Sequence, residues 1–244
     1  MMFAMPFVVA GGVAGGFDLH AALLATASLA LFLADAPLTA LARGRQRTRA
    51  IRYAVAYGLA GAGASGVLMT DCRALVLIPF GLLALAVMGV RLSQASARRD
   101  RSAGVELLSL AGFSASAPAT YAVLTGRLDA TALMLWALHA LFFGSSVFYV
   151  KMRVQTVVRR VSKRSPDFSR ATVFYHAGLA VLVLTLALAG HLPALAALAF
   201  APIVVRALWA AARRPGRILL WRVGAAETGY LAAFAVLVVM AFRM

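Results

Sequence analysis

The chain contains one cysteine, two lysines and no asparagine among its 244 residues. The single cysteine, Cys72, excludes an intramolecular disulfide and any metal site built from several thiolates. The eight acidic residues are scattered, and no two of the His, Asp and Glu residues stand three or four positions apart. Helical bundles take the ligands of di-iron and zinc sites from such one-turn spacings. We therefore expect no metal site and no cofactor.

What the chain has in abundance is apolar sequence. Hydrophobic residues make up 63% of it, charged residues only 13%, and the mean hydropathy is +0.88. A soluble domain of this size must expose much of its surface to water and could not hide so much apolar area. The composition predicts an integral membrane protein.

Nine apolar stretches alternate with short polar breaks, and most approach the roughly 20 residues that a helix needs to cross a bilayer. The first is short, rich in glycine and contains Pro6. A cleaved signal peptide is the alternative there, but no basic segment precedes it. We expect one all-α membrane domain over 1–244, a polytopic bundle of about nine transmembrane helices. Its spans are expected at about 2–17, 20–42, 53–70, 74–92, 103–124, 130–150, 171–190, 194–212 and 225–242.

Positive charge is concentrated in every second break. The formal net charge is +16, and 20 of the 24 basic residues lie in Arg43–Arg52, Arg91–Arg101, Lys151–Arg170 and Arg213–Arg222. Basic residues in short loops mark the cytoplasmic side. We expect the N-terminus in the cytoplasm, the C-terminus outside, and a location in the bacterial cytoplasmic (inner) membrane. Because topology and anionic head groups account for these loops, no nucleic-acid partner is expected.

The longest of these loops, Lys151–Arg170, carries valines among its charges. This pattern predicts an amphipathic extension of the sixth helix along the inner head groups.

Ionisable side chains inside a span are costly and are therefore candidates for function. Five of them fall about 7–12 Å inside the cytoplasmic boundary at 1.5 Å per helical residue. These are Asp35, Glu106, His176, Arg206 and Glu227. Two interpretations stay open. In one, Arg206 pairs with a carboxylate to join helices, and Glu106 and Glu227 are stabilised near the starts of their helices. In the other, the five line a polar cavity that opens to the cytoplasm.

In the second interpretation, Lys151, Arg153 and Arg206 would hold an anionic head without metal. Asp35 and His176 would handle protons if a reaction occurs, whereas His139, deeper in the sixth span, is expected to be a packing residue. No catalytic residue is assigned beyond these two candidates. The candidate ligand-binding residues are Asp35, Glu106, Tyr149, Lys151, Arg153, His176, Arg206 and Glu227.

Three segments resemble the YwiC-like family of bacterial membrane proteins. The stretch Trp136–Arg153 (W-A-L-H-A-L-F-F-G-S-S-V-F-Y-V-K-M-R) is similar to that family's sixth helix. Ser114–Tyr121 and a turn at Asp35–Leu38 (D-A-P-L) are similar as well. The family typically opens with a Glu-His-Gly-Ala-Trp-like segment, whereas the first residues of this chain resemble the part of the family sequence directly after that segment. The resemblance implies a membrane protein but little about activity.

The nine-span plan also resembles UbiA-type intramembrane prenyltransferases. That resemblance implies a UbiA-like helix arrangement and two Asp-rich clusters that hold Mg²⁺ on an isoprenyl diphosphate. This chain has no Asn-Asp-x-x-Asp motif, and Ser145–Arg153 places cations where the second cluster would need carboxylates.

The favoured hypothesis is a UbiA-shaped bundle that binds an anionic lipid or isoprenoid phosphate in a cytoplasm-facing cavity without Asp-rich Mg²⁺ sites. Its partners would be membrane lipids, with a polyprenyl phosphate among the candidates. The main alternative is a non-catalytic membrane assembly or scaffold protein, in which every intramembrane charge could be neutralised without loss of function. A small-solute transporter, which would need polar residues through both halves of the bilayer, and a divergent prenyltransferase are further alternatives.

Overall fold

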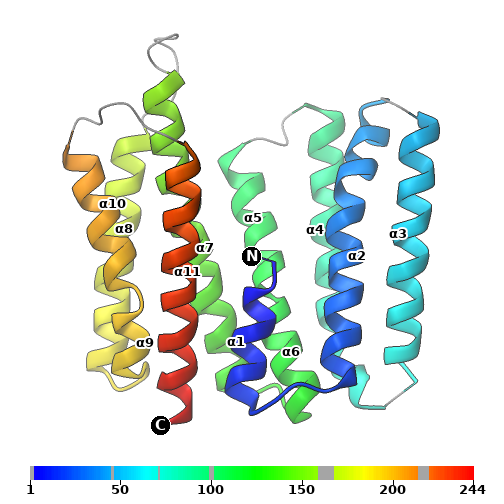
Figure 1. Cartoon of the computed structure of the whole chain (residues 1–244), viewed down its shortest axis with the longest axis horizontal. Helices are drawn as coiled ribbons and strands as arrows, with labels where there is room; N and C mark the ends of the chain where they lie inside the picture. Colours follow the sequence, from blue (N-terminus) through cyan, green and yellow to red (C-terminus); the bar gives the residue numbers. More distant parts are fainter. Residues whose placement is uncertain (1–2, 45–46, 71, 99–101, 159–167, 214–219) are drawn as a thin grey trace. The chain divides into compact units, whose positions relative to one another are not determined.

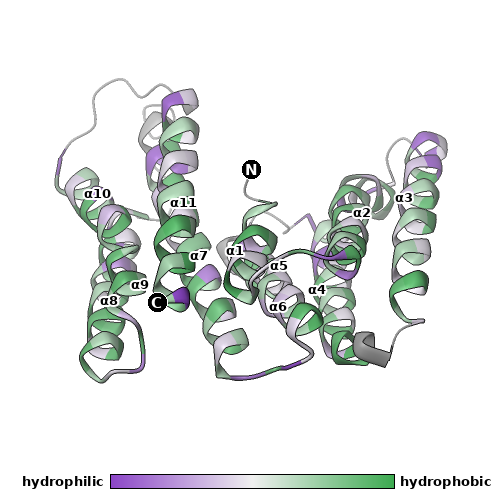
Figure 2. Cartoon of the chain, turned by 60° about the horizontal axis from the view of Figure 1, so that its bottom comes forward, coloured by the Kyte–Doolittle hydropathy of each residue, from purple (hydrophilic) through white to green (hydrophobic). Residues whose placement is uncertain are grey.

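The computed structural model describes residues 3–44, 47–70, 72–98, 102–158, 168–213 and 220–244. These residues form eleven α-helices and one 3-10 helix, without a β-strand among them. The prediction of an all-α fold is confirmed. Within the described residues, seven helical segments are long and apolar enough to cross a membrane, and Figure 2 shows hydrophobic residues along most of their length. The protein is a multi-pass membrane protein, in which helices satisfy their own backbone hydrogen bonds.

The chain divides into two compact units, Pro6–Ala140 and Leu141–Met244 with Met1–Met5, and each is considered by itself. The predicted single membrane domain over 1–244 stays a prediction. The first unit contains α1 (Met5–Ala14), α2 (Leu19–Ala42), α3 (Arg47–Leu68), η1 (Cys72–Leu77), α4 (Ile78–Ser96), α5 (Ala103–Ser114), α6 (Ser116–Thr125) and the start of α7 (Ala130–Val158). The second contains the rest of α7, α8 (Phe168–Leu188), α9 (Ala194–Leu198), α10 (Ala201–Ala212) and α11 (Leu220–Arg243).

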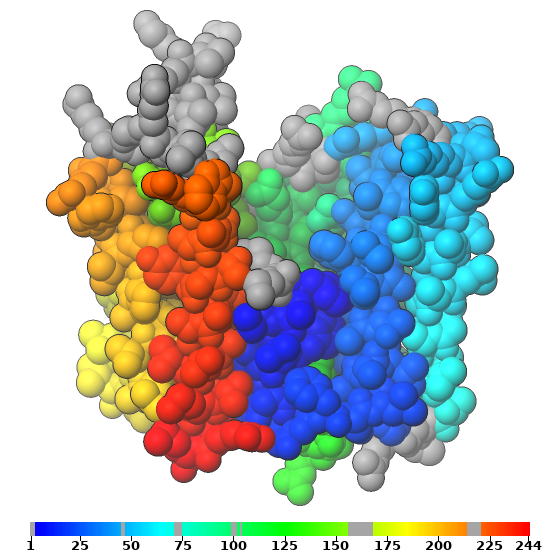
Figure 3. Space-filling model, viewed as in Figure 1, coloured from blue at the N-terminus to red at the C-terminus, as the bar shows by residue number. Residues whose placement is uncertain are grey.

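Two of the nine predicted spans differ from the expectation. α1 has only 10 residues, about 15 Å of helix, because the chain turns at Gly15 with a φ of +99°. α3 is long enough at 22 residues but is not among the seven apolar segments. Its first turns carry Arg47, Arg49 and Arg52, and Figure 2 shows this end as hydrophilic. α3 packs along the length of α2 (Figures 1 and 3).

Proline explains where other spans break. The span at 103–124 is split into α5 and α6 at Ala115, because Pro118 has no N–H for the carbonyl of Ser114. The span at 194–212 is split in the same way before Pro202. The span predicted at 20–42 is confirmed by α2, which continues through Pro37 at the cost of one backbone hydrogen bond; the Asp35–Leu38 segment of the family resemblance is therefore helical and not a turn.

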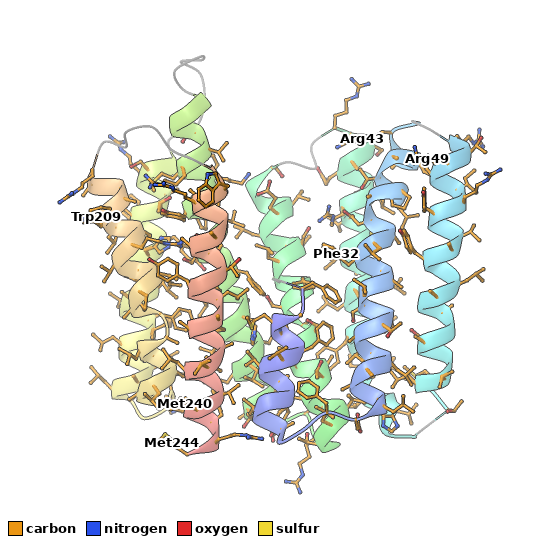
Figure 4. All side chains as sticks on the ribbon, in the orientation of Figure 1. Phe32, Arg43, Arg49, Trp209, Met240 and Met244 are labelled. Atoms are coloured by element: carbon orange, nitrogen blue, oxygen red, sulfur yellow. The ribbon has the colours of Figure 1, made fainter. Side chains whose placement is uncertain are left out.

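Each unit gathers basic residues at one end. In the first unit, the connections from α2 to α3 and from α4 to α5 lie at the same end (Figure 1), which carries Arg43 and Arg49. In the second unit, α7 and α10 end where α8 and α11 begin. Figure 4 places Trp209 at this end of α10, and Met240 and Met244 at the opposite end of α11. The alternation of the loops agrees with the helix directions inside each unit, and the predicted sidedness in the membrane stays a prediction.

The predicted extension of the sixth helix is found in part. α7 continues to Val158, eight residues beyond the predicted end at 150. The rest of the predicted segment, residues 159–167, lies outside the described residues.

Aromatic side chains form the core of the second unit. Phe142 of α7, Phe200 at the start of α10 and Phe234 of α11 are each at most 1% exposed. The ring centroids of Phe142 and Phe234 are 4.3 Å apart, and those of Phe200 and Phe234 are 5.5 Å apart. This packing fixes α7 against α11 and thereby positions the polar residues that lie nearer the basic end.

Candidate functional site

A run of three small residues on α7, Gly144-Ser145-Ser146, brings polar side chains of neighbouring helices close to α7. A Cβ at Gly144 would lie 2.5 Å from the hydroxyl oxygen of Tyr175. This hydroxyl donates a hydrogen bond of 2.9 Å to the carbonyl of Leu141. Glycine at position 144 therefore lets α8 approach α7 closely enough for direct hydrogen bonds.

Ser145 faces α8 and forms a fully buried pair with His176. The Nδ1 atom of His176 lies 2.8 Å from the carbonyl oxygen of Thr172, and its Nε2 lies 2.8 Å from the Oγ of Ser145. Since a carbonyl can only accept, Nδ1 carries a proton and donates to Thr172, and Nε2 pairs with the hydroxyl of Ser145. Both ring nitrogens are thus hydrogen-bonded, which ties α7 to α8.

Ser146, one residue later, faces α11. Its hydroxyl donates a 2.7 Å hydrogen bond to Oε2 of Glu227. The other carboxylate oxygen, Oε1, accepts from Nη1 of Arg206 on α10. The side chains of Arg206 and Glu227 are only 10% and 7% exposed. One buried network therefore joins α7, α10 and α11, and within it Arg206 pairs with a carboxylate, as one of the two interpretations expected.

Aromatic rings cover the Arg206 guanidinium. Its central carbon lies 3.9 Å from the ring centroid of Tyr149 and 4.5 Å from that of Tyr230. Ala207 and Ala210, the small neighbours of Arg206 on α10, pack against Tyr149 and allow this approach. Arg153 also lies against the Tyr149 ring, at 5.6 Å. Two guanidinium groups from different helices thus meet at one tyrosine.

Several donors in this cluster lack a hydrogen-bond partner among the described residues. They are the Nε and Nη2 atoms of Arg206 and the Nε atom of Arg153, all of them buried. Buried N–H groups without a partner cost about 1–3 kcal/mol each, and more when the group is charged. Arg153 and Arg206 meet at Tyr149, and Glu227 pairs with Arg206, so the three side chains together carry a net charge of +1. The cluster is therefore both positively charged and short of acceptors.

Comparison with known proteins identifies the family through the N-terminal half. The YwiC-like protein family matches residues 1–121. The chain belongs to the YwiC-like family. No curated protein and no solved structure matches it. The matched half of this YwiC-like protein contains Asp35 and Glu106, whereas the cluster around Tyr149 lies beyond the matched residues.

Within the first unit of this YwiC-like protein, Asp35 is paired. Its Oδ2 accepts a 2.8 Å hydrogen bond from Nη2 of Arg91 on α4. Both side chains are about a third exposed, at 28% and 32%. Glu106 lies in the first turn of α5, which Ser102 caps. These two candidates belong to the first unit, and the other six belong to the second.

The six candidates in the second unit are not all brought together. Tyr149, Arg153, Arg206 and Glu227 form the cluster described above. His176 lies near enough to Arg206 and Glu227 to interact with them electrostatically. Lys151 is two residues from Tyr149, about 200° around the helix, and its Nζ lies 5.6 Å from the ring of Phe168. Phe168 in turn packs against the hydrophobic cluster of Tyr149, Met152, Ala207 and Ala210, so Lys151 lies at the edge of the same region.

The sequence alone did not identify Ser145, Ser146, Tyr230 or Arg91 as site residues. Tyr230 had a usable signal, because it lies three positions after Glu227 and so shares its helix face. The two serines had none, since hydroxyls in membrane helices commonly bond to their own backbone. His139 is a packing residue as predicted: it is fully buried, and its Nδ1 lies 2.7 Å from the carbonyl of Leu135. No group of three or more His, Cys, Asp or Glu side chains in the described part of the chain could hold a metal ion.

Proposed function

We propose that this YwiC-like protein binds the phosphate head of an anionic lipid or isoprenoid in the bacterial cytoplasmic membrane, through Arg206 and Arg153. The observation that carries the proposal is the set of buried, unpartnered N–H groups on these two arginines. Charged donors without acceptors are unfavourable in a low-dielectric interior. An oxyanion would supply the acceptors and the negative charge at once.

The part of Arg206 that lacks a partner has the right shape for an oxyanion. Glu227 uses Nη1, which leaves Nε and Nη2. These two nitrogens form the side edge of the guanidinium, a fork whose parallel N–H bonds match two oxygens of a phosphate or carboxylate. Tyr149 and Tyr230 cover the ring-facing sides, so a ligand would lie in the guanidinium plane.

Arg153 provides the route to this fork. It is partly exposed and lies one helical turn beyond Tyr149 toward the basic end of the unit. Because the free nitrogens of Arg206 are buried and Arg153 is partly exposed, the head group would contact Arg153 before Arg206. The apolar tail stays among the lipid-facing side chains.

The test is native mass spectrometry of the purified full chain with added dioleoyl phosphatidic acid and dioleoyl phosphatidylglycerol. We expect Arg153→Ala and Arg206→Lys each to weaken binding about tenfold, since a bidentate charged contact is worth roughly 1.5–3 kcal/mol. Arg213→Ala is the matched control, because Arg213 is an exposed arginine at the same end that contacts Trp209 instead.

A double variant, Arg206→Met with Glu227→Gln, removes the buried pair as a whole and so avoids leaving a lone buried charge. It should fold and lose binding. Equal binding by the wild type, Arg153→Ala, the double variant and Arg213→Ala would refute the assignment.

A scaffold function is the second candidate, and the ion pairs favour it. Arg206 with Glu227, and Asp35 with Arg91, each join two helices inside one unit. In a scaffold, these pairs serve helix packing alone. That function predicts that the double variant, once folded, keeps every protein partner of the wild type in a pull-down from membranes.

A further inference from the structure

Glu227 is the acidic residue in the cluster around Tyr149, and both of its oxygens are engaged. Oε1 accepts from Arg206, and Oε2 accepts from the hydroxyl of Ser146 at 2.7 Å. Two hydrogen bonds from different helices hold the carboxylate in place, with 7% of its side chain exposed. Glu227 is therefore a fixed negative charge beside the Arg206 fork.

The other polar groups packed around Glu227 do not add charge to the cluster. His176 of α8 is fully buried and hydrogen-bonded to Thr172 and Ser145, and because a buried charge is costly we count its imidazole as neutral. Tyr149 of α7 and Tyr230 of α11 present their rings to Arg206. Arg206 and Arg153 supply two positive charges against one negative charge, so the group carries +1.

We propose that Glu227 is a specificity-determining residue that restricts the cluster to an oxyanion of one negative charge, a phosphodiester rather than a phosphomonoester dianion. This inference rests on the proposed function. A phosphodiester has two non-bridging oxygens for the fork and one charge, which neutralises the +1 of the cluster. A second charge on the ligand would remain uncompensated and would face the Glu227 carboxylate in a low-dielectric environment.

The experiment measures binding of dioleoyl phosphatidylglycerol, a diester, and dioleoyl phosphatidic acid, a monoester, to the full chain at pH 8. At this pH the monoester carries close to two charges, since its second ionisation lies near pH 6. We expect the wild type to prefer the diester about tenfold, from like-charge repulsion at an effective dielectric constant near 20. Glu227→Gln keeps an acceptor for Ser146 and should abolish or reverse this preference.

Glu106→Gln is the matched control, because it removes a carboxylate from the first unit and should leave the preference unchanged. If neither lipid binds the wild type in an Arg153-dependent manner, the proposed function fails. If both bind through Arg153 but the ratio is the same in the wild type and Glu227→Gln, the proposed function stands and the role of Glu227 is refuted.

A pH series on the wild type covers the case in which Glu227→Gln does not fold. Binding of phosphatidic acid should weaken about tenfold between pH 5 and pH 8 as its second charge forms, while binding of phosphatidylglycerol stays constant. Phosphatidic acid binding that is independent of pH over this range would overturn the inference.

Discussion

Removing one member of the Arg206–Glu227 pair should destabilise the protein far more than removing both. The two side chains are 10% and 7% exposed, so either single variant leaves a charge in the membrane interior. Such losses typically cost about 3–5 kcal/mol. Arg206→Met also loses its contacts with Tyr149 and Tyr230, about 1–2 kcal/mol in a desolvated setting.

In the double variant, Arg206→Met with Glu227→Gln, no lone charge remains. Its cost is then mainly the lost ring contacts and one hydrogen bond, about 2–3 kcal/mol. The two single costs sum to about 7–12 kcal/mol by the same estimates. The coupling energy should therefore be at least about 4 kcal/mol.

The assay is reversible unfolding of the full chain in mixed micelles, with the free energy followed against the mole fraction of sodium dodecyl sulfate. Asp35 and Arg91 form the matched control pair, since one 2.8 Å contact joins them and both are about a third exposed. Their coupling should stay below about 1 kcal/mol. Additive single effects at Arg206 and Glu227, or equal coupling energies for the two pairs, would refute the reasoning.

Two further predictions concern other elements. Gly144→Ala should lower the free energy of unfolding by about 1–3 kcal/mol in the same assay, because the new methyl group displaces the Tyr175 hydroxyl from its hydrogen bond to the carbonyl of Leu141. An unchanged stability would contradict the close approach of α8 to α7 at Gly144. Burial acts to raise the pKa of Asp18, the N-cap of α2, but hydrogen bonds from the Ala21 N–H and His20 outweigh it, so this pKa lies below its usual value. Because its pKa is lowered, Asp18 contributes its full stabilisation above its unfolded pKa near 3.9, and this contribution is lost as the pH falls further, through the lower pKa of the folded protein. Asp18→Ala should therefore be about 1 kcal/mol less stable at pH 7 and should converge with the wild type only as the pH falls below that folded-state pKa, while Asp18→Asn keeps a capping acceptor at every pH. A difference that stays constant with pH would contradict the role of the charge.

The sequence was sufficient for the class of protein and for most of the helices. Apolar length and the alternation of arginine-rich breaks depend on composition and spacing, which are visible along the chain. Composition and spacing were less reliable for predicting where each helix begins and ends. It predicted too long a first span, because Gly15 ends α1 after ten residues, whereas the span predicted at 20–42 is confirmed, since a membrane helix tolerates Pro37.

Depth along each helix could also be inferred from the sequence, and it selected Arg206 and Glu227 among the candidates. Arg206 and Glu227 were expected at similar depth, and one hypothesis paired Arg206 with a carboxylate. Which carboxylate was not determined, because depth gives the position along a helix but not the neighbour across from it. Asp35, Glu106 and Glu227 were all predicted at a similar depth, so depth alone could not show which of them pairs with Arg206.

The tertiary structure decided the partners. Asp35 and Arg91 are 56 positions apart and Ser146 and Glu227 are 81 apart, and no local pattern links residues at such separations. Ser145 and Ser146 are adjacent in the chain but face different helices, because successive residues lie about 100° apart around α7. The sequence by itself thus determined a basic-ended membrane bundle with a few buried charges. Only the packing of α7, α8, α10 and α11 determined that Arg206 is paired through Nη1 while its Nε and Nη2 have no partner among the described residues.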